Sequence, residues 1–243
     1  MHLSPIEYIG TQPRKPKRNS LKTFIISATL LSLGAFGLYK YGASDLFAAQ
    51  NDHRKRFTVE EYTSLHLNSD TQLNKFLAAA INRTTQSISY DPKYYEINFP
   101  LGDIPKDKGV CSDVIIRTYR AIGIDLQEMV YDDMVDNYQS YPKNWNLSKP
   151  DPNIDHRRVP NLKNFFSRNG VSLPLSDTPS DYKKGDIVVW KLSHGAPHIG
   201  IVVPSPIESD DTPWIVHNVG LGPQWQNCLF DYDITGHYRF KVD

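Results

Sequence analysis

The chain has 243 residues, of which 27 are Lys or Arg, 27 are Asp or Glu, and 40% are hydrophobic. This length allows one or two domains, and the composition is that of an ordinary globular protein, which excludes wholesale disorder. The formal net charge of zero argues against a basic surface that coats nucleic acid, so we expect no nucleic-acid partner. The two cysteines are too few for a disulfide-rich scaffold and lack the spacing of a structural zinc site.

The N-terminal part of the chain predicts a membrane segment. Residues 1–22 carry five basic residues against Glu7 alone, a net charge of +4, and an uncharged apolar run over 23–39 follows directly. A run of this length is just able to span a bilayer, and basic residues before it are typical of a signal-anchor. We therefore expect a basic cytoplasmic tail (1–22), one span of a bacterial inner membrane (23–39) and a periplasmic remainder. A cleaved signal that releases a soluble periplasmic protein is the alternative.

The rest of the chain is expected to form a linker over 40–68 and a catalytic domain over 69–243. Apolar residues recur at helical spacing in four segments of this domain, which are residues 69–86, 110–123, 125–141 and 159–170. Two of these helices are expected to begin at capping boxes, Ser69 with Gln72 and Asp125 with Glu128. Short β-branched or aromatic runs follow at 185–192, 198–203, 214–219 and 236–240. Helices first and strands afterwards predict an α+β fold in which the helices pack on a mostly antiparallel sheet.

Cys111 is the first candidate for chemistry, because it is expected in the first turn of a helix. The positive end of the helix dipole and the unpaired N–H groups at that position favour a thiolate, and the same N–H groups can stabilise an oxyanion. A cysteine alone in this position is more often a small buried hydrophobic residue than a nucleophile. The assignment therefore requires a partner base.

Two histidines in the predicted sheet supply that base and its support. His198 opens one strand, where a neutral imidazole can take the thiol proton and later return it to a leaving amine. His217 ends the next apolar run and can bond the far ring nitrogen of His198, which fixes its tautomer. Adjacent strand residues point to opposite faces, so only one of His217 and Asn218 can do this. We predict His217, and expect Asn218 to contribute to substrate binding.

The order of these groups resembles that of papain-like cell-wall peptidases of the NlpC type. The matching stretches are GVCSDVIIRTYR at 109–120, GDIVVW with HIGIVV, and IVHN. The additional stretches DHRRVPNL at 155–162 and GHYRF at 236–240 are similar to the YijF-type family of exported bacterial proteins. The resemblance implies a papain-like fold and a thiol amidase acting on peptidoglycan peptides without a cofactor. It also implies that Cys111, His198 and His217 are nucleophile, base and orienting group.

Several charged residues near these motifs are expected to bind the substrate. Asp113 stands where the peptidases commonly carry a small residue, and an acid there can raise the thiol pKa or shape the substrate pocket. The adjacent arginines of the tract Asp155, His156, Arg157 and Arg158 can bind a carboxylate of a peptide stem by paired hydrogen bonds. A solvated run of charges is the competing interpretation of this tract.

Four other interpretations are open. His194, His198 and His217 could bind zinc for hydrolysis, but Gly195 and Pro197 remove the helix that would give the first two a common face, so we predict no metal site. The tryptophans and tyrosines could form a non-catalytic wall-binding surface, although no carbohydrate-binding repeat is present. An acyltransferase would use the same thiol. Finally, Cys111 could form a disulfide with Cys228, which otherwise has no expected partner.

Overall fold

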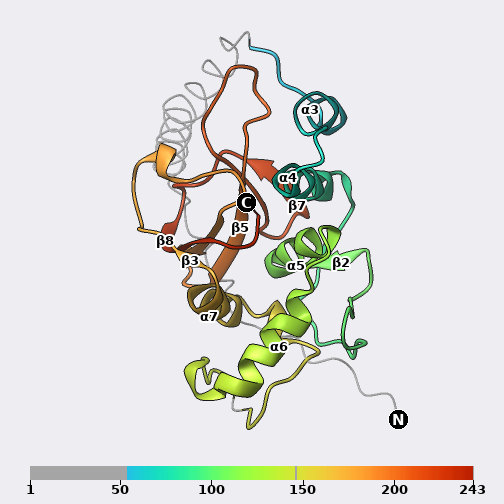
Figure 1. The fold of residues 1–243 in the computed structure, drawn as a ribbon, viewed down its shortest axis with the longest axis vertical. Helices are drawn as coiled ribbons and strands as arrows, with labels where there is room; N and C mark the ends of the chain where they lie inside the picture. The colour runs from blue at the N-terminus through green and yellow to red at the C-terminus, as the bar shows by residue number, and fades with distance from the viewer. Residues whose placement is uncertain (1–53, 146, 243) are drawn as a thin grey trace, which may run out of the picture. The chain divides into compact units, whose positions relative to one another are not determined.

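A computed structural model describes residues 54–145 and 147–242 of the chain (Figure 1). The expected cytoplasmic tail and membrane segment lie outside the described residues. None of the helices within these two ranges combines the length and the apolar character that crossing a bilayer requires.

The four predicted helices are present. They are α4 (Gln72–Asn82), α5 (Cys111–Ala121), α6 (Leu126–Asn137) and α7 (Val159–Asn169). Gly123 follows α5 with a φ of +83°, a conformation that only glycine adopts without strain, and this residue ends the helix as expected. Pro160 lies in the first turn of α7, and Gly170 caps its C-terminal end. Short 3-10 helices connect these elements, at η2 (Arg83–Thr85), η3 (Tyr138–Ser140), η4 (Asp155–Arg157) and η5 (Pro179–Asp181).

The start of α4 differs from the prediction. Thr71, not Ser69, is the N-cap residue, and its hydroxyl accepts a hydrogen bond from the Asn74 amide (3.2 Å). Ser69 instead bonds the side chains of Thr71 and Asn74. Thr71 is itself a good N-cap residue, so the preference of the residue type did not distinguish the two positions.

The folded domain begins earlier than residue 69. The helix α3 (Val59–His66) lies within the segment expected to be a linker, and it begins at a capping box formed by Thr58 and Glu61. Tyr62 on α3 is buried and contacts Trp225 edge to face, with ring centroids 5.3 Å apart. The segment is thus anchored by a few aromatic contacts, which a search for continuous apolar periodicity does not detect.

The four predicted strands form the centre of a six-stranded sheet in the order β3-β8-β4-β5-β6-β7. All its pairs are antiparallel, which confirms the expected strand direction. The strands are β3 (Val171–Ser172), β4 (Ile187–Lys191), β5 (Pro197–Val203), β6 (Trp214–Asn218), β7 (Pro223–Gln226) and β8 (Asp233–Arg239). A separate parallel pair is formed by β1 (Ser89–Tyr90) and β2 (Lys108–Gly109). The two edge strands β3 and β7 were not predicted.

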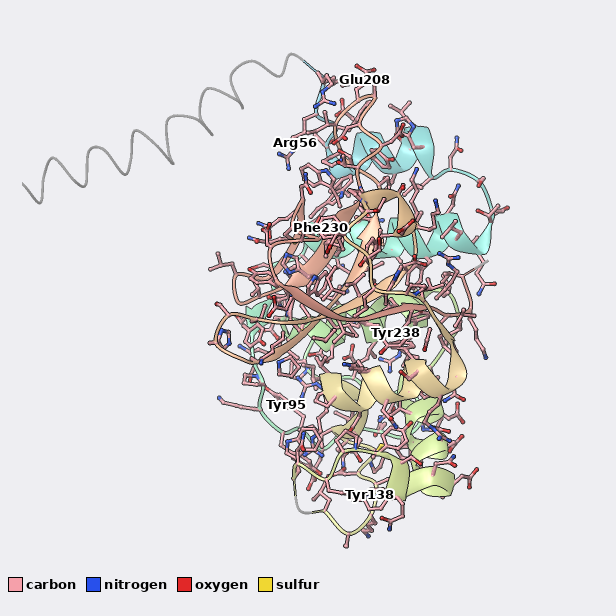
Figure 2. All side chains as sticks on the ribbon, turned by 90° about the vertical axis from the view of Figure 1, so that its left-hand side faces the viewer. Arg56, Tyr95, Tyr138, Glu208, Phe230 and Tyr238 are labelled. Carbon is pink, nitrogen blue, oxygen red and sulfur yellow. The ribbon has the colours of Figure 1, made fainter. Side chains whose placement is uncertain are left out.

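The sheet separates two apolar clusters. Ile199 and Val216 belong to the larger cluster, together with residues of the helices α4, α5 and α7, which lie along this face (Figure 1). Trp190 and Ile215 belong to the smaller cluster on the opposite face, with Cys228 and Leu229. Figure 2 shows how far side chains fill the described domain, from Arg56 and Glu208 at one end to Tyr138 at the other. The fold is therefore a mixed arrangement of helices and an antiparallel sheet, as the order of the sequence patterns predicted.

Candidate active site

Cys111 is the first residue of α5, and its side chain is only 5% exposed. The thiol lies where the start of α5 meets β5, and the backbone amides of Ile199, Ser112 and Cys111 itself lower its pKa. Asn218 contacts the segment that precedes this helix, because its side-chain amide donates to the Gly109 carbonyl oxygen (3.4 Å). The amides of Ser112 and Cys111 act in the direction that the helix-start position predicted, and the amide of Ile199 on β5 acts in the same direction.

The thiol of Cys111 is nevertheless protonated at neutral pH. Burial raises its pKa to about 12, and the negative charge of Asp113 adds to this effect. The amides of Ile199 and of the first helical turn lower the pKa, but they do not offset the loss of solvent. The expectation that the helix terminus would favour a resting thiolate is therefore wrong, whereas the expected influence of Asp113 is confirmed in direction.

The rings of His198 and His217 are paired, as predicted. Nε2 of His198 lies 2.8 Å from Nδ1 of His217, and the ring centroids are 5.1 Å apart. The paired residues of β5 and β6 begin only at Ile201 and Val216, so the strands do not pair at the level of the histidines and their side chains bridge the space. Asn218 points away from this pair, which confirms the choice between the two neighbouring residues.

A glycine lets two apolar side chains pack closely beside His198 on β5. Gly200 lies two residues after His198, on the same face of β5. A Cβ atom at this position would lie 2.8 Å from the Ile215 side chain and 3.1 Å from the Trp190 ring. Trp190 in turn stands beside His198, with ring centroids 5.8 Å apart. The imidazole therefore has a fixed apolar neighbour.

Both histidines are held in the neutral form. Burial lowers the pKa of His198 to about 3, and the neighbouring His217 contributes in the same direction. Burial also lowers the pKa of His217, against an opposing effect of the hydrogen bond with Gln226. In the part of the chain that the structure describes, Nδ1 of His198 has no hydrogen-bond partner, and it is not among the polar atoms sealed from solvent without one. His198 can therefore act as a base through this nitrogen.

Contacts between Cys111 and the histidines are indirect. The sulfur meets the amide of Ile199, the residue that follows His198. Among the described residues, the sulfur forms no hydrogen bond with either histidine ring. Cys111 precedes His198 by 87 positions in the sequence, yet its thiol lies near the amide that follows His198, and no hydrogen bond joins the thiol to the base.

Two residues beside His217 were not predicted. Oε1 of Gln226 lies 2.9 Å from Nε2 of His217, and Sγ of Cys228 lies 3.4 Å from the same nitrogen. Gln226 is the last residue of β7 and Cys228 lies just after it. This strand contains no β-branched residues, so its sequence did not predict a strand. The alternation of Gln224, Trp225 and Gln226 was the available indication. The interpretation of Cys228 as a residue without a histidine partner is therefore wrong.

Asp113 and Arg157 do not face a substrate. The guanidinium of Arg157 donates from Nε to Oδ1 of Asp113 (2.9 Å) and from Nη2 to Oδ2 (3.1 Å), and both side chains are buried. Arg157 also donates to the carbonyl oxygens of Lys93 and Asp91, and Asp113 accepts from the amide of Val110. Arg157 therefore binds a carboxylate of its own chain, Asp113. The expectation that these two residues bind the substrate is wrong.

The other residues of the tract are also engaged inside the domain. Arg158 donates to Asp155 (2.7 Å) and lies over the ring of Trp145. Burial raises the pKa of Asp155, although its hydrogen bonds oppose this. His156 is 3% exposed, and burial lowers its pKa to about 3. The tract is not a solvated charge run, because Asp155, His156 and Arg157 are buried and the charged groups of Asp155, Arg157 and Arg158 are paired within the domain.

The structure also bears on the zinc site and the disulfide that the sequence left open. His194 is exposed in the turn before β5, whereas His198 and His217 are buried. Within the described ranges, no group of three or more His, Cys, Asp or Glu residues is arranged to hold a metal ion. Cys111 and Cys228 are both free thiols. The geometry therefore gives no support to the zinc or disulfide interpretations.

Comparison with known proteins places the chain among bacterial relatives. Residues 77–240 match the family described as "Domain of unknown function (DUF1287)". The chain is also 42% identical over 197 residues to a protein of Escherichia coli (strain K12) named "Uncharacterized protein YijF". This match covers 81% of the present chain and 95% of the relative. With more than half of its length matched, the chain belongs to the DUF1287 family.

Proposed function

We propose that this protein is a thiol amidase or peptidase in which Cys111 is the nucleophile, His198 is the base and His217 orients the base. The observation that carries the proposal is the 2.8 Å pairing of His198 with His217, together with a cysteine at a helix start whose thiol lies near the amide of Ile199, the residue after His198. A base with one nitrogen held and the other unbonded is the arrangement that acyl transfer requires. The finer expectation that the fold is papain-like, of the NlpC type, is part of this proposal.

The resting site starts from neutral groups. Because the pKa values of Cys111 and His198 are shifted in opposite directions, to about 12 and about 3, the pair rests as thiol and imidazole. Proton transfer therefore accompanies attack on the substrate, as in general base catalysis, and does not precede it. The thiol has to reach Nδ1 of His198 for this transfer, because no hydrogen bond joins the two groups in the free protein.

The reaction is then a two-step acyl transfer. The Cys111 sulfur attacks the carbonyl carbon of an amide while its proton passes to Nδ1 of His198, and the negative charge develops on the carbonyl oxygen. The amides at the start of α5 lie near this charge. His198 then gives the proton to the leaving amine as the C–N bond breaks, which leaves a thioester. Water, losing a proton to the same nitrogen, attacks the thioester and releases a carboxylic acid and the thiol.

We place the substrate among peptidoglycan peptides. The resemblance to cell-wall peptidases supports this class, and an exported domain would meet such peptides in the periplasm. For this location we propose one inner-membrane span over residues 23–39, supported by the basic leader and the apolar run. An acyltransferase would share the first step and differ only in the acceptor of the acyl group.

The decisive experiment incubates the purified full-length chain with peptidoglycan fragments and detects new amine termini by mass spectrometry. Cys111→Ala should abolish cleavage, because no thioester can form, while Cys228→Ala should retain most of it. A metal chelator should have no effect. Cleavage that persists in Cys111→Ala and stops with chelator would support a zinc hydrolase. Transfer of the acyl group to an added amine, without hydrolysis, would identify an acyltransferase.

Absence of cleavage by the wild-type chain would contradict the proposal. A sedimentation assay with intact cell-wall sacculi then tests the non-catalytic alternative, since a wall-binding module should co-sediment equally well with and without the thiol. A thiol amidase should instead be trapped by a peptide thioester or nitrile, with a mass increase on the Cys111 peptide alone.

A further inference from the structure

Three side chains from three adjacent strands form one hydrogen-bonded line. Gln226 at the end of β7 contacts His217 on β6, and His217 contacts His198 on β5. The two distances are 2.9 Å from Oε1 of Gln226 to Nε2 of His217, and 2.8 Å from Nδ1 of His217 to Nε2 of His198. The line ends at Nδ1 of His198, the nitrogen left for the thiol.

The direction of the protons along this line follows from the chemistry of the groups. A neutral imidazole carries one N–H and one bare nitrogen, whereas an amide oxygen can only accept. With the amide oxygen of Gln226 facing Nε2 of His217, the ring proton of His217 lies on Nε2 and its Nδ1 is bare. That bare nitrogen accepts the proton on Nε2 of His198. Nδ1 of His198 is then the bare nitrogen, which is the form that can accept a proton from Cys111.

The opposite placement of the ring protons is unfavourable. A proton on Nδ1 of His217 would leave its Nε2 bare, so that two acceptors would face each other across 2.9 Å. The Cys228 thiol lies 3.4 Å from the same nitrogen and could donate to it, but a thiol is a weak donor. If Nδ1 of His217 carried the proton, Nε2 of His198 would accept it in a hydrogen bond. Nδ1 of His198 would then carry the ring proton and could not act as a base.

We infer that Gln226 is a positioning residue, whose amide oxygen holds the proton of His217 on Nε2 and thereby leaves Nδ1 of His198 bare and able to accept a proton. Its catalytic consequence rests on the proposed function. Gln226 contacts His217 and forms no hydrogen bond with Cys111 in the described residues, so it acts through the two histidines. It lies on the surface, along a groove of about 570 Å³.

The test reads the histidine tautomers directly. The full-length chain is labelled with ring-¹⁵N histidine, and the nitrogen chemical shifts of His198 and His217 show which nitrogen of each ring carries the proton. Gln226→Met removes the amide oxygen at a surface position. Gln226→Glu keeps an oxygen acceptor and cannot donate when ionised. It is measured at about pH 9, where a histidine beside a carboxylate is neutral. Gln224→Met changes the same residue type on the same strand and face.

In the wild type we expect protons on Nε2 of both rings. Gln226→Met should give mixed tautomers and an about 10-fold slower cleavage of the peptide substrate, the factor that one hydrogen bond is worth. Gln226→Glu at about pH 9 should keep the wild-type tautomers and rate. Gln224→Met should match the wild type in both measurements.

Three outcomes would overturn the inference. They are a wild-type His217 protonated on Nδ1, a Gln226→Glu variant that behaves like Gln226→Met, and a Gln226→Met variant that keeps the wild-type tautomers. Because the tautomers are read without substrate, the two proposals fail separately. Expected tautomers in a chain that cleaves no peptide would contradict the proposed function and support the inference about Gln226.

Discussion

Arg157 and Asp113 form a bidentate ion pair in which the side chains are only 3% and 4% exposed. Asp113 lies two residues after Cys111, and its Oδ2 also accepts the amide of Val110 (2.7 Å). Arg157 lies 44 residues further along the chain, and its backbone carbonyl accepts the hydroxyl of Ser112 (2.6 Å). The start of α5, and with it the thiol, is therefore fixed in place by a partner outside the helix.

This pair predicts a large loss of stability in Asp113→Ala. Removing the carboxylate leaves the Arg157 guanidinium buried without its counter-ion, which costs about 3–5 kcal/mol. The double variant Asp113→Leu/Arg157→Met should lose less, because no buried charge remains unpaired. Urea unfolding of the full-length chain, followed by tryptophan fluorescence, measures these differences.

The matched control for this prediction is Asp107→Ala. Asp107 is 70% exposed and contacts Lys108 at 3.8 Å, so its removal should change the unfolding free energy by less than about 0.5 kcal/mol. A loss in Asp113→Ala no greater than that of the control would show that the buried pair does not stabilise the helix start.

The low pKa of His198 predicts activity in mild acid. Its base form persists down to a pH of about 3, so kcat/KM should stay nearly constant from pH 8 to about 5 and decline only below that range. An ordinary imidazole would instead lose its base form below its usual pKa of about 6.5. Initial rates of peptide cleavage across this range distinguish the two, and a half-maximal rate near pH 6.5 would argue against a buried neutral base.

The buried thiol predicts slow but selective alkylation. At about pH 7.5, iodoacetamide should modify both cysteines more slowly in the folded chain than in urea, because burial raises both pKa values to about 12. Cys111 should react faster than Cys228, since amides surround its sulfur and His198 can accept its proton. The advantage should disappear in His198→Ala. Mass spectrometry of the two cysteine peptides gives both rates, and faster labelling of Cys228 would contradict the assignment of the nucleophile.

His156 predicts a loss of stability in acid that is independent of the reaction. Its folded pKa of about 3 lies below the unfolded value of 6.5, so only the unfolded chain gains a proton as the pH falls through this window. Stability should therefore be highest above pH 6.5 and fall by at most about 1.4 kcal/mol per pH unit for each such histidine. His156→Gln should make the dependence shallower between pH 6.5 and 4. Urea titrations at several pH values test this, and an equal slope in the variant would refute it.

The location of the domain can be tested with a reporter. A reporter that is active only in the periplasm, fused after residue 50, should be active, because the basic tail and the apolar run over 23–39 predict one membrane span. The full-length chain should also need detergent for extraction. Release by osmotic shock in a shortened form would support a cleaved signal, and activity only of a cytoplasmic reporter would reject both forms of export.

The sequence was informative wherever the structure follows a local rule. Period-2 alternation identified His217, not Asn218, as the partner of His198, and β6 follows that alternation without a bulge. Helical periodicity located α5 and placed Cys111 in its first turn. The helix α3 escaped notice because one side chain, Tyr62, supplies its buried contact.

Properties that depend on distant partners were not accessible in the same way. The carboxylate partner of Arg157 is 44 residues away, so the two charges looked available for a substrate. The effect of the helix start on Cys111 is local and was correctly identified in sign, but the burial that outweighs it depends on segments distant in sequence, such as β5 and β6, that pack against α5. Gln226 was missed because its strand, β7, has no β-branched residues.

The strand β8 is the last along the described chain, yet it lies in the interior of the sheet, between β3 and β4. A chain still being synthesised or exported, up to residue 232, already contains Cys111, His198 and His217. It lacks the strand that joins β4 to β3, and it lacks the buried Phe240 that packs on α7. Without β8, the strands β4 to β7 can still pair, but β3 has no partner strand and the sheet stays incomplete.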